Sequence, residues 1–227
     1  MTPEEIVVYS NTENKVTGKI KVGKNFDHLA ISPKNNMLIL SNGNSNTIKF
    51  IKYEFIHEID TTGLPFKGAE NAPVVVAVFD DYQCPYCARL VPILYEVTKK
   101  YPDKVKLVIK HFPLSFHTFA NKAAKAALAA DRQGKFWELN DMLFKNQSEL
   151  SDEKIIEIAK ELNLDIEKFK KDMESESVNS LIARDMANAQ SIGVRGTPAV
   201  YINGRLLKQR SLKGFENAIE DELKNKK

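Results

Sequence analysis

Cys84 and Cys87 are the residues in this sequence whose type and spacing most directly permit chemistry. They are the two cysteines among 227 residues, and they enclose the dipeptide Pro85-Tyr86. A framework of structural disulfides would use more cysteines at wider spacing, because cross-links that close long loops constrain the unfolded chain most. A lone C-x-x-C pair that follows an apolar segment instead indicates a thiol–disulfide exchange centre.

The elements around the pair indicate how it would react. The apolar run at 73–79 predicts a buried strand that delivers Cys84 to the N-terminus of a helix. Unpaired backbone N–H groups and the helix dipole favour a thiolate there, and the thiolate is the nucleophile in disulfide exchange. Cys84 is therefore the candidate nucleophile, and Cys87, one turn later, is the candidate resolving cysteine. Pro85 suits the first helical turn because its missing N–H would be unpaired anyway.

Two other interpretations of the pair remain open. The cysteines could be buried and inert within a helix, or they could be half of a metal site. A thiolate zinc site needs a second cysteine pair or histidines at ligand spacing, and the sequence holds no further cysteine. We therefore expect neither a metal nor another cofactor.

A second signal lies far downstream, at Thr197-Pro198 within the segment Gly193-Val194-Arg195-Gly196-Thr197-Pro198. A proline at the start of a strand cannot donate a hydrogen bond to the sheet. A cis bond before Pro198 would be a specific feature, because about 5–6% of such bonds are cis. The alternative is a trans proline that interrupts a loop.

The order of elements after residue 62 predicts an α/β domain. Residues 118–190 have an almost continuous helical pattern, with Ser151 and Asp165 as N-caps inside it. Asn203-Gly204 predicts a two-residue hairpin turn. The other expected elements are strands at 73–79, 105–112, 198–202 and 205–209, a helix after Cys84 and a helix at 212–223. This order matches a thioredoxin-like fold over 63–227, with a helical block inserted at about 118–190.

Residues 1–62 have a different composition. Short β-forming runs alternate with Asn, Gly and Ser, which predicts a small antiparallel all-β module. Turns are expected at 11–14, 23–25, 32–36 and 41–46. The expected strands are 6–9, 16–22, 28–31, 37–40, 47–52 and 54–59.

The charge and hydropathy of the chain exclude some classes of function. The net charge is +3, from 33 basic and 30 acidic residues, which is too balanced to indicate a nucleic-acid partner. No apolar run approaches the roughly 20 residues of a membrane span. The start, Met1-Thr2-Pro3-Glu4-Glu5, does not predict a secretory signal. We expect either a cytosolic protein or one whose signal or anchor is absent from this sequence.

Several motifs in one order resemble the DsbA-like branch of the thioredoxin superfamily, from about residue 64 to residue 223. The resemblance implies a thiol–disulfide oxidoreductase that acts on protein or peptide thiols and disulfides. It also implies a redox partner that recycles the pair, and a periplasmic or other extracytoplasmic compartment. The segments that carry the likeness are Asn71-Ala72-Pro73, 79–87, 111–117, 133–138, 193–198 and 201–204.

The resemblance also implies roles for individual residues. Cys84 would be the surface nucleophile and Cys87 the resolving cysteine. Pro198 would be a cis-proline that faces the pair, and Thr197 would bind an extended substrate through its backbone. Pro85-Tyr86 would shape the site between the two cysteines.

Two departures from the family pattern affect the expected chemistry. Many relatives have a buried glutamate six residues before the first cysteine, where this chain has Val78. Proton transfer at Cys87 would then use Lys110, Asp81 or water. The strongest oxidants of the family have a histidine between the cysteines, where this chain has Pro85-Tyr86. The resemblance therefore implies a milder oxidant.

His111 and His117 border the predicted helical block. Histidine titrates near neutral pH, so either ring would be able to tune the cysteine pair. We favour the alternative that both are structural or exposed.

The N-terminal residues resemble β-propeller repeats of the YVTN type over about one and a half blades, from Ile6 to Ile48. A propeller needs four or more blades to close its ring. The module would therefore dock on the other domain, pair with a second copy, or come from a longer propeller-bearing protein.

Three functions follow from these patterns. The leading hypothesis is a thiol–disulfide oxidoreductase with a C-P-Y-C active site. The second is a dimeric disulfide isomerase or reductase that dimerises through the β module, which is the layout of DsbC-type proteins. The third, of another class, is a binding or scaffold protein with a vestigial cysteine pair.

Overall fold

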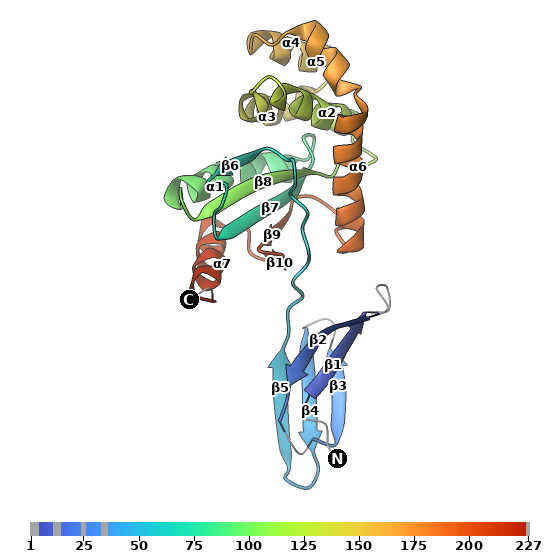
Figure 1. Cartoon of the computed structure of the whole chain (residues 1–227), viewed down its shortest axis with the longest axis vertical. Coiled ribbons are helices and arrows are strands. Elements are labelled where there is room, and N and C mark those ends of the chain that lie inside the picture. The colour runs from blue at the N-terminus through green and yellow to red at the C-terminus, as the bar shows by residue number, and fades with distance from the viewer. Residues whose placement is uncertain (1–4, 11–14, 24–25, 33–35, 226–227) are drawn as a thin grey trace. The chain divides into compact units, whose positions relative to one another are not determined.

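The computed structural model describes residues 5–10, 15–23, 26–32 and 36–225. The chain divides into two compact units between Phe55 and Ile56. We name them the N-terminal unit and the C-terminal unit and describe each by itself (Figure 1).

The N-terminal unit consists of antiparallel strands. β1 (Glu5–Ser10) pairs with β2 (Lys15–Lys21), and β3 (His28–Ser32), β4 (Met37–Asn42) and β5 (Thr47–Lys52) form a second sheet in that order. Leu38 and Leu40 are buried on one face of β4, as the period of two along a strand requires. The predicted antiparallel β module is confirmed. The first few residues and the turns expected at 11–14, 24–25 and 33–35 lie outside the described residues.

The strand expected at 54–59 is wrong, because this segment pairs with no strand. Instead, the backbone N–H of His57 donates to the carbonyl of Gly204 at 2.8 Å. The Asn188 amide donates to the carbonyl of Glu58 at 3.1 Å. Residues 56–62, named the strap below, therefore pack on the C-terminal unit, which starts at Ile56 rather than at the sequence-based boundary of residue 63.

The C-terminal unit is built on a five-stranded sheet of order β10-β9-β7-β8-β6. The central strands β7 (Val74–Asp80) and β8 (Val105–His111) are parallel. They are nearly continuous runs of buried residues, as expected of strands covered on both faces. The shorter strands β6 (Phe66–Gly68), β9 (Ala199–Ile202) and β10 (Arg205–Leu206) flank them in antiparallel pairings.

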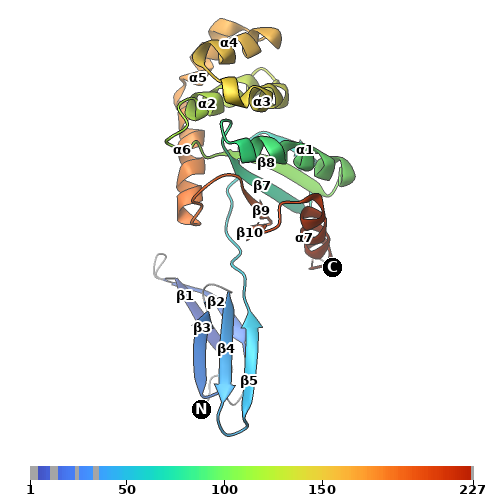
Figure 2. The ribbon, with the colours of Figure 1, turned by 180° about the vertical axis from the view of Figure 1, so that it is seen from behind.

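Helices cover both faces of this sheet. α1 (Pro85–Lys100) and α7 (Leu212–Asn225) share a core with Val76 and Val78 of β7. Phe79, which points the other way, packs in a second cluster with Ala189 of α6 (Glu176–Ser191). Figure 2 shows α1 and α6 on different sides of the sheet. Successive residues of β7 and β8 therefore enter two different environments, the α1 face and the α6 face.

The inserted helical block contains α2 (Ala120–Asp131), α3 (Phe136–Lys145), α4 (Asp152–Glu161) and α5 (Ile166–Met173), and it leads into α6 (Figure 1). Ser151 caps α4 by accepting from the backbone N–H of Lys154 at 3.1 Å. Asp165 caps α5 by accepting from that of Lys168 at 3.0 Å. Both predicted N-caps are confirmed. The alanines of α2 are buried, which lets neighbouring helices approach its backbone closely.

Asn203-Gly204 forms the predicted turn between β9 and β10, with φ of 45° and 80°. Glycine is required at 204 for a second reason, because an added Cβ would lie 2.2 Å from the His57 carbonyl oxygen. The Asn203 side chain accepts from the Val75 N–H at 2.8 Å and donates to the Pro73 carbonyl at 3.2 Å. The turn therefore holds both the strap and the start of β7.

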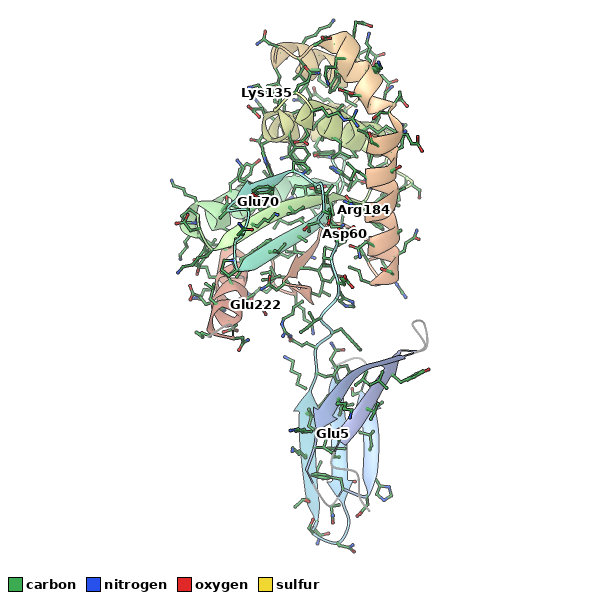
Figure 3. All side chains as sticks on the ribbon, in the orientation of Figure 1. Glu5, Asp60, Glu70, Lys135, Arg184 and Glu222 are labelled. Carbon is green, nitrogen blue, oxygen red and sulfur yellow. The ribbon has the colours of Figure 1, made fainter. Side chains whose placement is uncertain are left out.

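An ion pair lies in the core on the α6 face of the sheet. The Lys110 Nζ of β8 is 2.8 Å from the Asp185 Oδ1 of α6, and both side chains are fully buried. The ammonium also donates to the carbonyl of Asp60 in the strap. Arg184 of α6 pairs with the Asp60 carboxylate at 3.3 Å, and the two labelled side chains lie together in Figure 3. Sheet, helix and strap therefore converge on one pair of charges.

We predict that Asp185→Asn lowers the free energy of unfolding by about 3–5 kcal/mol, because it leaves the Lys110 ammonium buried without a counter-charge. Urea unfolding followed by circular dichroism measures the change. The matched control is Glu216→Gln, which removes an ion pair to the half-exposed Lys100 and should cost far less, because solvent screens an exposed pair. Equal losses in the two variants would contradict the prediction.

Candidate active site at the Cys84–Cys87 pair

The two cysteines lie where the central strand passes into its helix. β7 ends at Asp80, a short turn follows, and α1 begins at Pro85 with Cys84 as its N-cap residue. The Cys84 backbone is extended, with φ of −80° and ψ of 118°. Both cysteines are free thiols and are largely buried. The predicted placement of Cys84 at a helix N-terminus is confirmed.

The downstream Thr197-Pro198 segment lies against this helix N-terminus. The Cys84 Sγ donates to the carbonyl of Thr197 at 3.5 Å. The Thr197–Pro198 peptide bond is cis, as the resemblance implied. Residues 113 positions apart in the sequence therefore meet at one sulfur atom.

Asp81 organises the turn before the cysteines. Its buried carboxylate accepts from the backbone N–H of Gln83 at 2.7 Å and from that of Leu114 at 2.8 Å. It also lies 2.8 Å from the His117 Nδ1. With these partners, Asp81 fixes the turn to the segment after β8.

The helical block holds the same turn from the other side. The Gln83 side chain accepts from the Phe119 N–H, and its carbonyl accepts from the Gln147 amide, both at 2.5 Å. The Tyr82 hydroxyl donates to the Asn140 side chain of α3 at 3.1 Å. The inserted helices therefore position the backbone that carries Cys84.

The electrostatics of the site centre on a buried acid. Burial raises the pKa of the Cys87 thiol, and the neighbouring Asp80 raises it further. Contacts with the Asp81 backbone and the Thr197 side chain offset only part of this rise. Burial likewise raises the pKa of the Asp80 carboxyl well above its ordinary value. Cys87 and Asp80 are thus two buried groups that both favour their protonated forms.

The surface beside the pair is aromatic and basic. Tyr86 is 64% exposed, although it stands between two buried cysteines. The Arg89 guanidinium lies 5.2 Å from the centroid of its ring. Phe116, in the segment after β8, is 74% exposed. Among the described residues, no group of three or more His, Cys, Asp and Glu side chains is arranged to hold a metal ion.

The sequence profile of the family described as Thioredoxin matches residues 60–221. The chain belongs to the thioredoxin family. The match corresponds to the C-terminal unit and confirms the thioredoxin-like fold expected for it. The likeness to BdbD of Bacillus subtilis, at 25% identity and a TM-score of 0.66, and to a probable disulfide bond formation protein supports the DsbA-like resemblance. The likeness of the N-terminal unit to propeller repeats stays a prediction.

The chain is similar to known proteins of different descriptions. The chain is 37% identical over 140 residues to the Na(+)/H(+) antiporter NhaA 3 of Salinispora tropica; the match covers 61% of this chain and 21% of the antiporter. It is 32% identical over 168 residues to the probable disulfide bond formation protein D of Bacillus anthracis, covering 69% and 77% of the two chains. A crystal structure of a thioredoxin-like oxidoreductase from Silicibacter pomeroyi superposes with a TM-score of 0.65 at 31% identity, covering 72% and 94%.

The chain therefore spans about a fifth of the length of the antiporters that it matches. Among the residues that the structure describes, none forms a helix long and apolar enough to cross a membrane.

The structure brings only some of the residues selected from the sequence together at this site. Cys84, Cys87, Thr197 and Pro198 come together, with Pro85 in the first turn of α1. Lys110 lies on the α6 face and is held by Asp185 and Asp60. This placement argues against a direct proton transfer between Lys110 and Cys87. Asp81 is engaged by three partners.

Sequence reasoning missed Asp80. The residue closes a run of apolar side chains, where an acid is easily taken for the polar end of a strand. Strand periodicity offered a signal, because Asp80 lies two residues after Val78 and therefore points to the same face. That face carries α1 and Cys87.

We predict that Cys87 reacts slowly with iodoacetamide in Cys84→Ser. Only thiolate is alkylated, and the raised pKa of Cys87 leaves little thiolate near neutral pH. At pH 8 the rate should be at least about tenfold below that of an unperturbed cysteine, whose pKa is about 8.5. It should still be rising at pH 10. Mass spectrometry of quenched samples measures the rate, with Cys87→Ser as the matched single-thiol control. A plateau below pH 9 would show that the thiol is not perturbed.

Proposed function

We propose that the protein is a thiol–disulfide oxidoreductase that exchanges disulfides with protein or peptide substrates through Cys84 and Cys87. The observation that carries the proposal is the position of the Cys84 sulfur, at the N-terminus of α1 and 3.5 Å from the Thr197 carbonyl, with Cys87 buried beside it. A sulfur at a helix N-terminus and a second thiol one turn away are the two components that mixed-disulfide exchange requires.

The two sulfur atoms have different roles in the reaction. A substrate thiolate attacks Cys84 of the oxidised pair, the Cys84–Cys87 bond breaks, and the electron pair passes to Cys87. A second substrate thiolate then attacks the substrate sulfur of the mixed disulfide and releases Cys84. In the reverse direction, Cys87 resolves the mixed disulfide. The same residues support both directions, and the redox poise of the compartment decides between them.

Thr197 and the exposed ring of Tyr86 are proposed to receive the substrate. The Thr197 carbonyl faces Cys84, so an extended peptide would find a main-chain acceptor beside the reacting sulfur, as in β-augmentation. Pro85 and the cis-Pro198 shape the two sides of this position. We further propose an extracytoplasmic location and a separate redox partner, because disulfides persist in oxidising compartments.

We predict that Cys84→Ser lowers insulin reduction by dithiothreitol to the uncatalysed rate. Cys87→Ser should instead accumulate a mixed disulfide with the substrate, visible as a band on a non-reducing gel that dithiothreitol removes. The physical reason is that Cys84 forms the intermediate and Cys87 resolves it. Unchanged turnover in Cys84→Ser would favour the binding or scaffold protein with a vestigial pair.

A dimeric isomerase is the second candidate. The observation that favours it is the exposed apolar surface of the N-terminal unit. Ile48 and Phe50, each 63% exposed, lie two residues apart on one face of β5. Contiguous exposed apolar residues of this kind mark interaction surfaces.

We predict for this candidate that the whole chain is dimeric at micromolar concentration, and that Ile48→Glu with Phe50→Glu makes it monomeric. Light scattering after size-exclusion chromatography measures the mass. The control is Leu206→Glu, which places a charge on an exposed apolar residue of the C-terminal unit. A wild-type monomer would exclude the dimeric layout and leave the oxidoreductase proposal intact.

A further inference from the structure

Asp80 and His111 are neighbours at the carboxyl ends of the two central strands. β7 and β8 run in parallel, and Asp80 is the register partner of His111. Register partners on adjacent parallel strands point to the same face, and the strands lie about 4.8 Å apart. Asp80 points to the α1 face, as its period-two neighbour Val78 does. The two side chains therefore share the space next to α1.

Both side chains are buried, and both have polar atoms without a protein partner. Among the described residues, none forms a hydrogen bond to the Asp80 Oδ1 or to either ring nitrogen of His111. Asp80 is 3% exposed and His111 is 1% exposed. The great majority of buried polar atoms in proteins have a partner, so a cluster of three such atoms requires an explanation.

The charged groups around this cluster are bound to other partners. On the α6 face, Lys110 and Asp185 pair with each other, and Asp185 also accepts from the His111 backbone N–H at 2.9 Å. In the turn, Asp81 binds His117. The Tyr82 ring lies 5.9 Å from the His111 ring, but its hydroxyl donates to Asn140. Phe136 of α3 closes another side, with its ring 6.3 Å from that of His111.

Cys87 is the ionisable group on which Asp80 and His111 can act. Asp80 acts electrostatically on Cys87, and Cys84 acts on Asp80. Burial, with a smaller effect of the Lys110 charge, lowers the pKa of His111 to about 3, so its ring is neutral. A neutral imidazole donates at one nitrogen and accepts at the other. It can therefore bind a carboxylate by donating or a carboxylic acid by accepting.

We propose that Asp80 exchanges the proton of the Cys87 thiol during disulfide exchange, with the ring of His111 as its positioning partner. The proposal rests on the thiol–disulfide function proposed above.

In the resolving direction, Cys87 loses its proton and attacks the mixed disulfide. In the fraction of molecules in which Asp80 is ionised, the Cys87 thiol gives its proton to the Asp80 carboxylate, and the Cys87 sulfur attacks Cys84 of the mixed disulfide. The Cys84–Cys87 bond forms, the bond between Cys84 and the substrate breaks, and the substrate leaves as a thiolate with the electron pair. In the oxidising direction, the carboxylic acid of Asp80 protonates the departing Cys87 thiolate.

The test follows resolution of the mixed disulfide between Cys84 and glutathione. Reduced protein is mixed with oxidised glutathione, quenched with acid at intervals and analysed by mass, from pH 6 to pH 10. In Asp80→Asn, the resolving step should be about 100-fold slower at pH 7. It should recover with rising pH, because hydroxide then removes the Cys87 proton. Formation of the mixed disulfide at Cys84 should keep its wild-type rate.

His111→Phe tests the pairing of the two groups. The variant keeps an aromatic ring but removes both nitrogens, and resolution should slow by roughly tenfold at pH 7. The double variant with Asp80→Asn should be no slower than Asp80→Asn alone, because groups that act as one unit are not additive. The control Tyr101→Phe removes a buried tyrosine hydroxyl at the far end of α1, where it donates to Glu220, and should leave the resolving rate unchanged.

Three outcomes would overturn the inference. Resolution at the wild-type rate in Asp80→Asn would exclude Asp80 as the proton acceptor. Multiplying effects in the double variant would show that the two groups act separately, and a loss confined to mixed-disulfide formation would place the defect at Cys84. If Asp80→Asn fails to fold, Asp80→Ser is measured in its place. A wild-type protein that forms no mixed disulfide at all would instead refute the proposed function.

Discussion

The Lys110–Asp185 pair crosses from β8 to α6 in a fully buried part of the core. Two charges at this depth carry a large desolvation cost, so each is stable only while the other stays in place. Lys110 also holds the Asp60 carbonyl of the strap, and Asp185 accepts from the His111 backbone. Any shift of α6 relative to the sheet would uncover one of these charges. The pair thereby fixes the helical block, the strap and the end of β8 in one arrangement.

The site depends on that arrangement because its parts come from the ends of these elements. Asp80 and His111 end the two central strands, and Cys84 begins the helix that follows the first of them. The block reaches the same region through Gln147 and Asn140, which bind the turn before Cys84. Rigid elements thus hold both sulfurs from several directions, and a disulfide-exchange site profits from such preorganisation because little has to be ordered during the reaction.

Local sequence signals predicted the parts of the molecule whose geometry is itself local. The C-x-x-C pair at a helix start, the caps Ser151 and Asp165, and the Asn203-Gly204 turn all depend on residues within a few positions of one another. The strand expected at 54–59 does not form, because a strand needs a partner strand. The side chains of 54–59 do not indicate whether a free sheet edge lies nearby. Instead, the main chain of this segment donates to the Gly204 carbonyl and accepts from the Asn188 side-chain amide.

The candidates for proton transfer illustrate the same limit. Lys110 was a reasonable candidate by its position in the sequence, but its register with Phe79 places it on the α6 face. The register of two parallel strands depends on how both strands are packed, so it cannot be predicted from a single sequence. The period of two along β7 places Asp80 on the face of Val78, but its burial follows only from the packing around it.

A chain with two cysteines, both at one site, has a single intramolecular disulfide available to it. Four cysteines would already allow three pairings. Within these 227 residues no mispaired disulfide can form, so oxidation of the pair cannot trap this part of the fold in a wrong topology. It can mature in an oxidising compartment, among the scrambled disulfides of other chains, without requiring an isomerase for itself.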